Sequence, residues 1–209
     1  EKEQTLMLAR DFFGIKPVYY AEIDGHFVFA SEIKSILAFP GYERKVNQKA
    51  LEQYLSFQYS PLEETFFKGI YKLMPGHMLL YKNGSYEIKT YFKPKLTPGQ
   101  WNHKTNMAQL RSQLSEILKD SVKHHMLSDV EVGAFLSGGV DSGYLASSSG
   151  ADQAFTVGFD EGDRYSEVNK AAKVAEKVGL KHHVKIISKQ EFWDALPDVM
   201  YHMDEPLGD

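Results

Sequence analysis

The residues with the clearest capacity for chemistry form one run, Ser137–Ser142, with the sequence Ser-Gly-Gly-Val-Asp-Ser. Two adjacent glycines let backbone N–H groups approach phosphate oxygens closely, and the two serines add hydroxyl donors. The carboxylate of Asp141 would repel a bare phosphate, but it suits a site in which Mg²⁺ bridges the protein and the phosphates. The run is therefore expected to bind a phosphate-bearing ligand together with magnesium.

The elements around this run favour a binding role. An apolar strand is predicted at Val130–Leu136, directly before the run, and a short helix at Asp141–Ser147. In an open parallel sheet such a turn lies at the carboxyl ends of the strands, where ligands bind, and the helix N-terminus adds partial positive charge. The alternative is a polar turn without function, because Ser, Gly and Asp are common in turns. Neither a Gly-Lys dipeptide nor a Gly-x-Gly occurs, so the Walker P-loop and the dinucleotide fingerprint are excluded.

The second half of the chain alternates between helical and strand patterns, which predicts a mostly parallel sheet with right-handed crossovers. A long amphipathic helix is expected over 105–127, with Thr105 as its N-cap and a face formed by Leu110, Leu114, Ile117 and Leu118. The other predicted elements are strands at Phe155–Phe159 and His183–Ile187, a helix at Ser166–Val178 that ends at Gly179, and a capping box from Ser188 to Glu191.

The first half reads as β-rich. Strands are predicted at Thr5–Ala9, Pro17–Tyr20, His26–Ala30, Met78–Lys82 and Tyr86–Tyr91, with helices near Glu32–Ala38 and Gln48–Phe57. Asn83-Gly84 is a hairpin signal because both residues tolerate positive φ. The proposed division is a first domain at 1–95, a linker at 96–104 rich in Pro and Gly, and a second domain at 105–209.

Composition excludes several classes of protein. The 209 residues carry a formal charge of −4, which gives no broad electrostatic attraction to nucleic acid. No apolar run approaches the roughly 18 residues of a membrane span, and no signal peptide is visible. Cysteine is absent, which excludes disulfides and thiolate metal sites within this chain. A cytoplasmic protein with small-molecule partners is expected, and a homodimer is left open.

Several separate motifs resemble one family. Ser137–Ser142 resembles the pyrophosphate loop of the ATP-pyrophosphatase (PP-loop) enzymes, and the whole chain is similar to glutamine-hydrolysing asparagine synthetase. The resemblance implies a mixed α/β and α+β fold. It consists of part of a β-rich glutaminase domain of the N-terminal-nucleophile type, followed by a doubly wound parallel-sheet PP-loop domain. The motifs are Ala9–Tyr20, Phe29–Lys34, Phe67–Ile70 and Pro75–His77 in the first half, and Gly133–Ser142, Phe155–Phe159 and Asp204–Asp209 in the second.

The resemblance implies a reaction and a set of site residues. The second half would bind Mg²⁺ and ATP and activate aspartate as β-aspartyl-AMP, and ammonia from glutamine would then displace AMP to give asparagine. Carried over by the motifs, Ser137, Gly138, Gly139, Asp141 and Ser142 hold the pyrophosphate, with Asp141 on the metal. Phe135, Leu136 and Val157 line the adenine pocket. Asp204 and Glu205 are the expected catalytic carboxylates, and Asp209 is a second expected metal ligand.

The chain also departs from the family pattern. The family's glutaminase uses Cys at the mature N-terminus, whereas this chain begins at Glu1 and contains no Cys, so an incomplete enzyme is expected. Three alternatives remain open: an asparagine-synthetase-like amidotransferase or cyclase that acts on another carboxylate, a PP-loop enzyme that modifies tRNA, and a nucleotide-binding protein without turnover.

Overall fold

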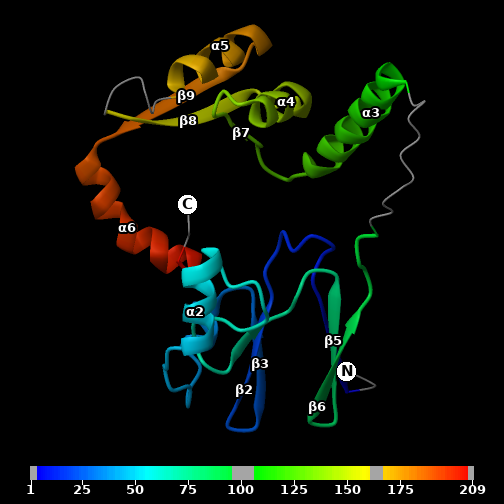
Figure 1. Ribbon diagram of the computed structural model, residues 1–209, viewed down its shortest axis with the longest axis vertical. Coiled ribbons are helices and arrows are strands. Elements are labelled where there is room, and N and C mark those ends of the chain that lie inside the picture. The colour runs from blue at the N-terminus through cyan, green and yellow to red at the C-terminus, as the bar shows by residue number, and fades with distance from the viewer. Residues whose placement is uncertain (1–3, 96–105, 161–166, 207–209) are drawn as a thin grey trace. The chain divides into compact units, whose positions relative to one another are not determined.

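The computed structural model describes residues 4–95, 106–160 and 167–206. The chain divides into two units. The first unit comprises residues 1–96 together with 197–209, and the second comprises residues 97–196. The first unit contains two sheets and the second contains one (Figure 1). Each unit also has its own hydrophobic core.

The first unit contains two antiparallel sheets of three strands (Figure 1). One sheet has the order β1-β5-β6 and the other β3-β2-β4. Asn83 has a φ of 51° in the turn between β5 and β6, as the Asn-Gly pattern predicts. The elements are β1 (Thr5–Ala9), β2 (Tyr19–Ile23), β3 (His26–Ala30), α1 (Ile33–Leu37), α2 (Gln48–Phe57), β4 (Ile70–Lys72), β5 (His77–Lys82) and β6 (Ser85–Thr90).

Strand β2 is buried on both faces. Its neighbouring residues Tyr20 and Ala21 point to opposite sides of the sheet and are only 2% and 1% exposed. Ala21 packs in a cluster with Ile33 and Ile36 of α1, whereas Tyr20 packs with Leu79 of β5. The β3-β2-β4 sheet therefore lies between helix α1 on one face and the β1-β5-β6 sheet on the other.

The loop after β1 is held by two charged side chains. The Arg10 guanidinium donates to three backbone carbonyls, and the Asp11 carboxylate accepts from three backbone N–H groups. These backbone hydrogen bonds, that from Lys16 first, lower the pKa of Asp11 below its ordinary value. The Ala9–Tyr20 motif thus organises a turn. The carbonyls belong to Gly14, Lys16 and Leu73, and the N–H groups to Phe13, Ile15 and Lys16.

The second unit is built on a parallel sheet with the order β7-β8-β9. Its strands are β7 (Ala134–Phe135), β8 (Gln153–Phe159) and β9 (Lys181–Ile187), and its helices are α3 (Met107–His125), α4 (Val140–Ser149) and α5 (Val168–Val178). Helix α6 (Lys189–Met203) begins in this unit and ends in the first unit. Among the described residues, no helix is both long enough and apolar enough to cross a membrane.

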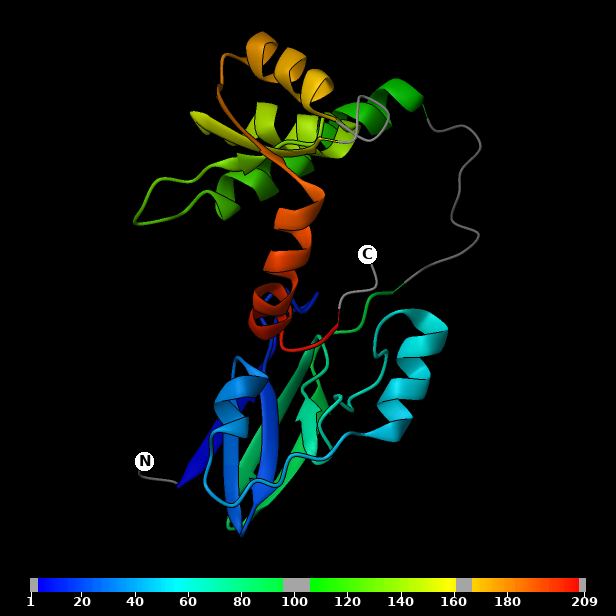
Figure 2. The same cartoon turned by 90° about the vertical axis from the view of Figure 1, so that its left-hand side faces the viewer.

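Both crossover helices cover the same face of this sheet. Ala146 of α4 and Ala171 and Ala175 of α5 form one buried cluster with Leu136 and with Ala154 of β8. Figure 2 shows the two helices and the strands of this sheet in a second view. The strands are added in one direction, from β7 through β8 to β9, so right-handed crossovers place both helices on the same face. A helix would cover the other face only if further strands were added beyond β7, in the opposite direction. The described residues thus show a parallel α/β layer, and the doubly wound arrangement stays a prediction.

Two of the predicted elements differ from the observed ones. The strand predicted at Val130–Leu136 is only Ala134–Phe135, because its partner β8 begins at Gln153 and leaves Val130 without a ladder partner and 77% exposed. The apolar face predicted for the long helix is largely exposed, with Val122 the buried residue of α3. Asn106, whose side chain accepts from the N–H of Ala108, caps this helix, and Thr105 lies outside the described residues.

The local signals at helix ends are confirmed. Helix α5 ends at Gly179 in the left-handed conformation, with a φ of 84°. The capping box at the start of α6 is reciprocal: the Ser188 N–H donates to Glu191 Oε2 at 2.8 Å, and the Glu191 N–H donates to Ser188 Oγ at 3.1 Å. These contacts, with the ion pair to Lys185 as the largest contribution, lower the pKa of Glu191 to about 2.

Candidate nucleotide-binding site

The run Ser137–Ser142 forms a tight loop between β7 and α4. The Ser137 and Ser142 hydroxyl oxygens lie 2.9 Å apart, and the Ser137 N–H donates to Ser142 Oγ at 3.2 Å. The Gly139 N–H points toward Ser137 Oγ at 3.4 Å. Gly139 is the N-cap of α4 in an extended conformation. The loop thus folds back on itself and brings two hydroxyl groups to the N-terminus of a helix.

Gly138 is required by the fold of this loop. Its φ is 76°, which residues with a side chain adopt at a cost. A Cβ at this position would lie 2.6 Å from Lys170 Cβ and 2.8 Å from the Ala171 nitrogen. The loop therefore lies directly against the first turn of α5, and no side chain fits between them.

The loop offers hydrogen-bond donors for the phosphates of a nucleotide and a carboxylate for the metal ion that accompanies them. The first N–H groups of α4 have no partner within the helix, and they carry the positive end of its dipole. A Cβ on Gly139 would lie 3.3 Å from Ser137 Oγ and 3.9 Å from Ser142 Oγ, so the glycine keeps the space beside both hydroxyls open. Asp141 lies exposed in the first turn of α4. The residues present therefore fit the expected phosphates and Mg²⁺.

A metal at Asp141 would need oxygen ligands from the nucleotide or from water. Within residues 4–95, 106–160 and 167–206, no group of three or more His, Asp or Glu side chains could hold a metal ion. Mg²⁺ is commonly bound through one or two carboxylates plus substrate phosphates. A lone Asp141 beside phosphate donors matches that type of site.

The buried hydroxyl of Thr156 forms a hydrogen bond to the residue that precedes the loop Ser137–Ser142. Thr156 of β8 is 5% exposed, and its Oγ1 donates to the carbonyl of Leu136 at 2.6 Å. The same oxygen lies 2.7 Å from Nε2 of His182 on β9. A hydroxyl has a single proton, and a carbonyl can only accept, so His182 must carry its proton on Nε2 and donate it to Thr156. Leu136 immediately precedes the loop, and this relay therefore ties the loop to all three strands.

Replacing Thr156 with valine is expected to lower both stability and nucleotide affinity. The substitution keeps the shape but removes both hydrogen bonds, which leaves a buried carbonyl and an imidazole without their partner and costs about 1–3 kcal/mol. Denaturant unfolding and calorimetry with Mg²⁺-ATP would measure the two effects. Thr156→Ser keeps the hydroxyl and should restore nucleotide affinity, whereas equal affinity of the valine variant and the parent would contradict a positioning role.

The predicted adenine-pocket residues are only partly brought together. Phe135 and Val157 line an open, largely apolar hollow of about 470 Å³ with Phe155 and His183 on the uncovered face of the sheet. The rings of Phe155 and His183 stack with centroids 4.9 Å apart. Leu136 is 2% exposed and packs in the core on the opposite face. Its side chain does not line this hollow, although its backbone adjoins the loop.

A second apolar hollow adjoins the loop from the helical side. Asp141 borders this space of about 460 Å³ together with Arg111, Leu114 and Leu118 of α3 and with Tyr144 of α4. The Tyr144 hydroxyl lies 3.4 Å from the Ser115 hydroxyl oxygen, which joins the two helices. The chemical groups of the loop are thus flanked by apolar surface on both sides.

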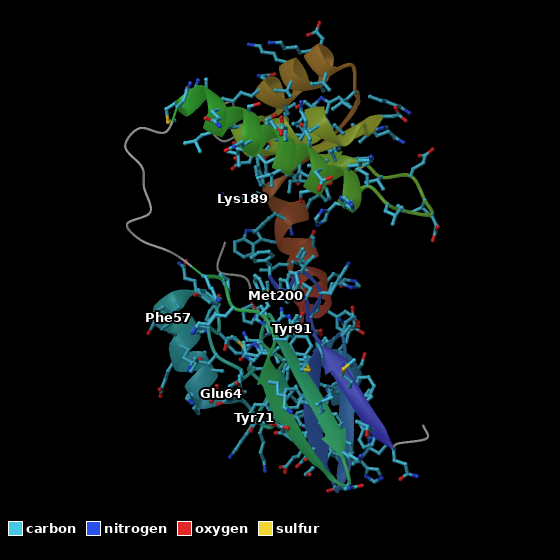
Figure 3. The ribbon with its side chains drawn as sticks, turned by 90° about the vertical axis from the view of Figure 1, so that its right-hand side faces the viewer. Phe57, Glu64, Tyr71, Tyr91, Lys189 and Met200 are labelled. Carbon is cyan, nitrogen blue, oxygen red and sulfur yellow. The ribbon has the colours of Figure 1, made fainter. Side chains whose placement is uncertain are left out.

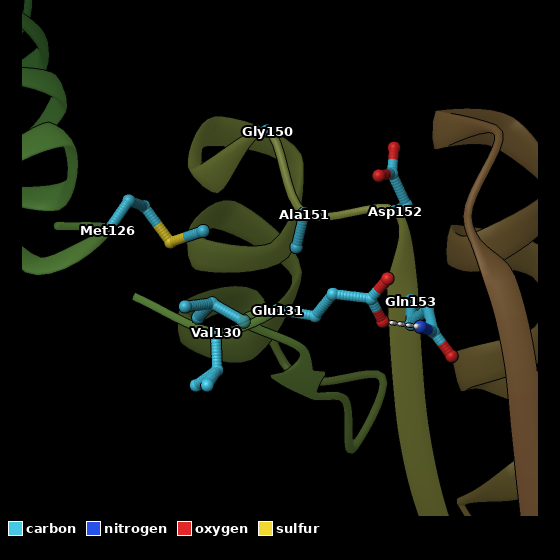
Figure 4. Close-up of a pocket in the computed structure, with 8 residues that line it drawn as sticks. Met126, Val130, Glu131, Gly150, Ala151, Asp152 and Gln153 are labelled. Carbon is cyan, nitrogen blue, oxygen red and sulfur yellow. Dashed lines mark hydrogen bonds between the residues drawn. The ribbon is translucent and has the colours of Figure 1, made fainter. Parts of the chain in front are cut away.

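A third hollow, of about 170 Å³, lies at the other end of the strands (Figure 4). It is lined by the residues before β7 and at the start of β8, where the Gln153 amide donates to Glu131 Oε2 at 3.0 Å. Strands β7 and β8 are parallel, so their starts lie opposite the carboxyl ends that carry the loop. This hollow does not belong to the nucleotide site.

The predicted catalytic carboxylates lie in the first unit. The Asp204 oxygens accept from the N–H groups of Ile33 and Lys34 at 2.7 and 3.2 Å, and Glu205 Oε1 accepts from the N–H of Phe66 at 3.4 Å. Asp209 lies outside the described residues. Sequence reasoning did not find the Thr156–His182 relay, because single Thr and His residues in two distant strands give no signal before their register is known.

The two halves of the chain match two classes of domain. Residues 1–92 match the model of the glutamine amidotransferase domain, and residues 113–209 match that of asparagine synthase. The structure of an NH3-dependent NAD synthetase from Campylobacter jejuni aligns with this chain at 20% sequence identity, and the alignment covers 46% of this chain and 42% of the synthetase chain. The TM-score of 0.29 is too low to establish a shared fold.

Curated relatives are similar to essentially the whole of this chain. The chain is 37% identical over 214 residues to glutamine-hydrolyzing asparagine synthetase 1 of Bacillus subtilis, covering 100% of this chain and 33% of that protein. It is 30% identical over 226 residues to amidase chyE of Penicillium rubens, covering 99% and 33%. The matches confirm the resemblance to glutamine-hydrolysing asparagine synthetases, and the chain spans about a third of the length of these relatives.

Proposed function

We propose that this chain is part of an ATP-dependent, glutamine-dependent carbon–nitrogen ligase that converts aspartate to asparagine. The observation that carries the proposal is the loop Ser137–Ser142, with its paired hydroxyls, its open glycine and its position at the N-terminus of α4. The relatives named asparagine synthetase and the amidotransferase match of the first half support the same reaction class.

The residues of the loop would act on the phosphates of ATP. The N–H groups of the first turn of α4, with Ser137 and Ser142, would bind the pyrophosphate that leaves when the aspartate carboxylate attacks the α-phosphorus to form β-aspartyl-AMP. Asp141 would hold Mg²⁺, which neutralises phosphate charge when it is bound. Phe135 and Val157 would provide the apolar wall for adenine, because they line the hollow beside the loop.

The amide nitrogen would come from glutamine through the amidotransferase part of the protein. The 209 residues contain no Cys, so this segment does not supply a thiol nucleophile for glutamine hydrolysis. What the first unit does supply is a two-sheet scaffold and the Arg10–Asp11 loop. Cytoplasmic location and a homodimer belong to the same proposal.

A second candidate is amidation of another carboxylate. The similarity to amidase chyE favours it, since that protein shares 30% identity over the same length of this chain. The adenylating loop would serve either acceptor, because it contacts phosphates and not the acceptor side chain.

Pyrophosphate release in the gene product that contains residues 1–209 tests the proposal. Release is expected when aspartate, Mg²⁺-ATP and either glutamine or ammonium are present together, with AMP and asparagine formed in equal amounts. Omission of aspartate should stop it. Release with a different carboxylic acid and none with aspartate would favour the second candidate, and an absence of release with every acid would overturn adenylation itself.

A further inference from the structure

The carboxylate of Asp204 is fully engaged inside the first unit. Its side chain is 8% exposed, its two oxygens accept from the N–H groups of Ile33 and Lys34, and Oδ1 lies 3.2 Å from Lys34 Nζ. The Lys34 side chain is itself 17% exposed and lies 3.2 Å from Glu32 as well. Burial opposes the charge of Lys34, but its contacts with Asp204 and Glu32 outweigh burial and raise its pKa. A metal ion at Asp204 would have to compete with this ammonium group.

The backbone turns sharply to make this contact. Met200 lies on α6 (Figure 3). The Asp204 N–H donates to the Met200 carbonyl at 3.1 Å, which closes the last turn of the helix, and Asp204 then adopts a φ of 63°. A left-handed conformation is unusual for a residue with a side chain, although Asp tolerates it better than most. The turn directs the carboxylate onto the start of α1. Tyr201 contributes from the same end of α6, because its ring centroid lies 5.4 Å from Lys34 Nζ.

Glu205, the next residue, makes a similar contact with the backbone of the first unit. Glu205 accepts from the N–H of Phe66, and burial raises its pKa against the opposing effect of Lys72. The nearby Tyr19 hydroxyl has a pKa of about 12, raised by burial first and then by the charges of Glu205 and Asp204. Both carboxylates after α6 therefore lie among residues of the first unit.

We propose that Asp204 is an anchor that fastens the end of α6 to the first unit through α1 and Lys34, and that it is a positioning residue and not a metal ligand. Helix α6 begins in the second unit and ends in the first unit, where Asp204, Ile33 and Lys34 all lie. The function of this anchor, which rests on the proposed reaction, is to keep glutamine hydrolysis and aspartate activation coupled.

The first test compares three variants of this chain: Asp204→Asn, Asp204→Ala and, as the matched control, Glu32→Gln. The control removes the other, half-exposed partner of Lys34 and leaves the backbone contacts in place. Hydrogen exchange at the Ile33 and Lys34 amides should accelerate about tenfold or more in Asp204→Ala, and less in Asp204→Asn, which keeps an acceptor oxygen. Glu32→Gln should leave both rates unchanged. Unchanged exchange in Asp204→Ala would overturn the anchor.

The second test separates the anchor from a metal role. Calorimetry with Mg²⁺-ATP should give the same affinity for Asp204→Asn and for the parent, and a loss of magnesium-dependent binding would overturn the proposal. In the gene product that contains residues 1–209, the same variant should retain glutaminase and ammonia-dependent asparagine formation but form severalfold less asparagine per glutamine hydrolysed. A parent without asparagine formation would refute the proposed function, whereas an unchanged ratio in the variant would refute the coupling role alone.

Discussion

Replacing Asp141 with alanine is expected to abolish the magnesium-dependent part of ATP binding. Asp141 is the one carboxylate of the described loop residues, and it lies exposed in the first turn of α4 beside the hydroxyls of Ser137 and Ser142. Loss of outer-shell partners already lowers metal affinity 10–100-fold, so loss of the ligand itself should weaken Mg²⁺-ATP binding by about a hundredfold or more. Calorimetry in the presence and absence of Mg²⁺ measures the effect.

Asp152→Ala is the matched control for this result. Asp152 is also an exposed carboxylate of the second unit, but it lies at the start of β8, beside the hollow of Figure 4. It changes the net charge equally and should leave the affinity for Mg²⁺-ATP unchanged. Equal losses in both variants would show a general charge effect, and full binding by Asp141→Ala would remove Asp141 from the metal site.

Replacing Gly138 with alanine is expected to disrupt the loop itself. The new methyl group would lie 2.6 Å from Lys170 Cβ and 2.8 Å from the backbone nitrogen of Ala171, and the backbone would keep an unfavourable φ of 76°. Overpacking typically costs about 1–3 kcal/mol, and the left-handed conformation adds about 1–2 kcal/mol. We expect a loss of about 2–5 kcal/mol in the free energy of unfolding and undetectable ATP binding, measured by denaturant unfolding and calorimetry.

Gly150→Ala separates strain from steric clash. Gly150 ends α4 with a similar φ of 69°, but a Cβ there would meet nothing within 4 Å. This variant should lose only the cost of the left-handed conformation, about 1–2 kcal/mol, and should retain ATP binding. If both variants lost the same stability and the same affinity, contact between the loop and α5 would not explain the glycine.

The elements predicted well are those that local residue patterns determine. The bounds of β1, β3 and α2 agree with the sequence-based prediction, because alternation, turn residues and helical spacing act within a few positions. The capping box at Ser188 and the glycine end of α5 are confirmed for the same reason. The short strand β4 (Ile70–Lys72) was missed, since three residues carry no periodic signal.

Local patterns do not reveal the surroundings of residues that depend on distant parts of the chain. Leu136 and Val157 are both apolar and both near the loop. The Leu136 side chain lies in the core, whereas the Val157 side chain lies on the opposite, uncovered face of the sheet. The roles of Asp204 and Glu205 were predicted from an acidic cluster, which does not reveal that α1 and Phe66 lie within hydrogen-bonding distance. The Thr156–His182 relay required the register between β8 and β9.

The contact between Ile33 and Asp204 also has a consequence for folding during synthesis. The two residues are 171 positions apart, and the whole second unit is translated between them. When β6 has left the ribosome, the six strands described in the first unit are available, but the N–H groups of Ile33 and Lys34 at the start of α1 still lack the Asp204 carboxylate. This contact of the first unit can therefore form only after the second unit and α6 have been translated, by closure of a long loop.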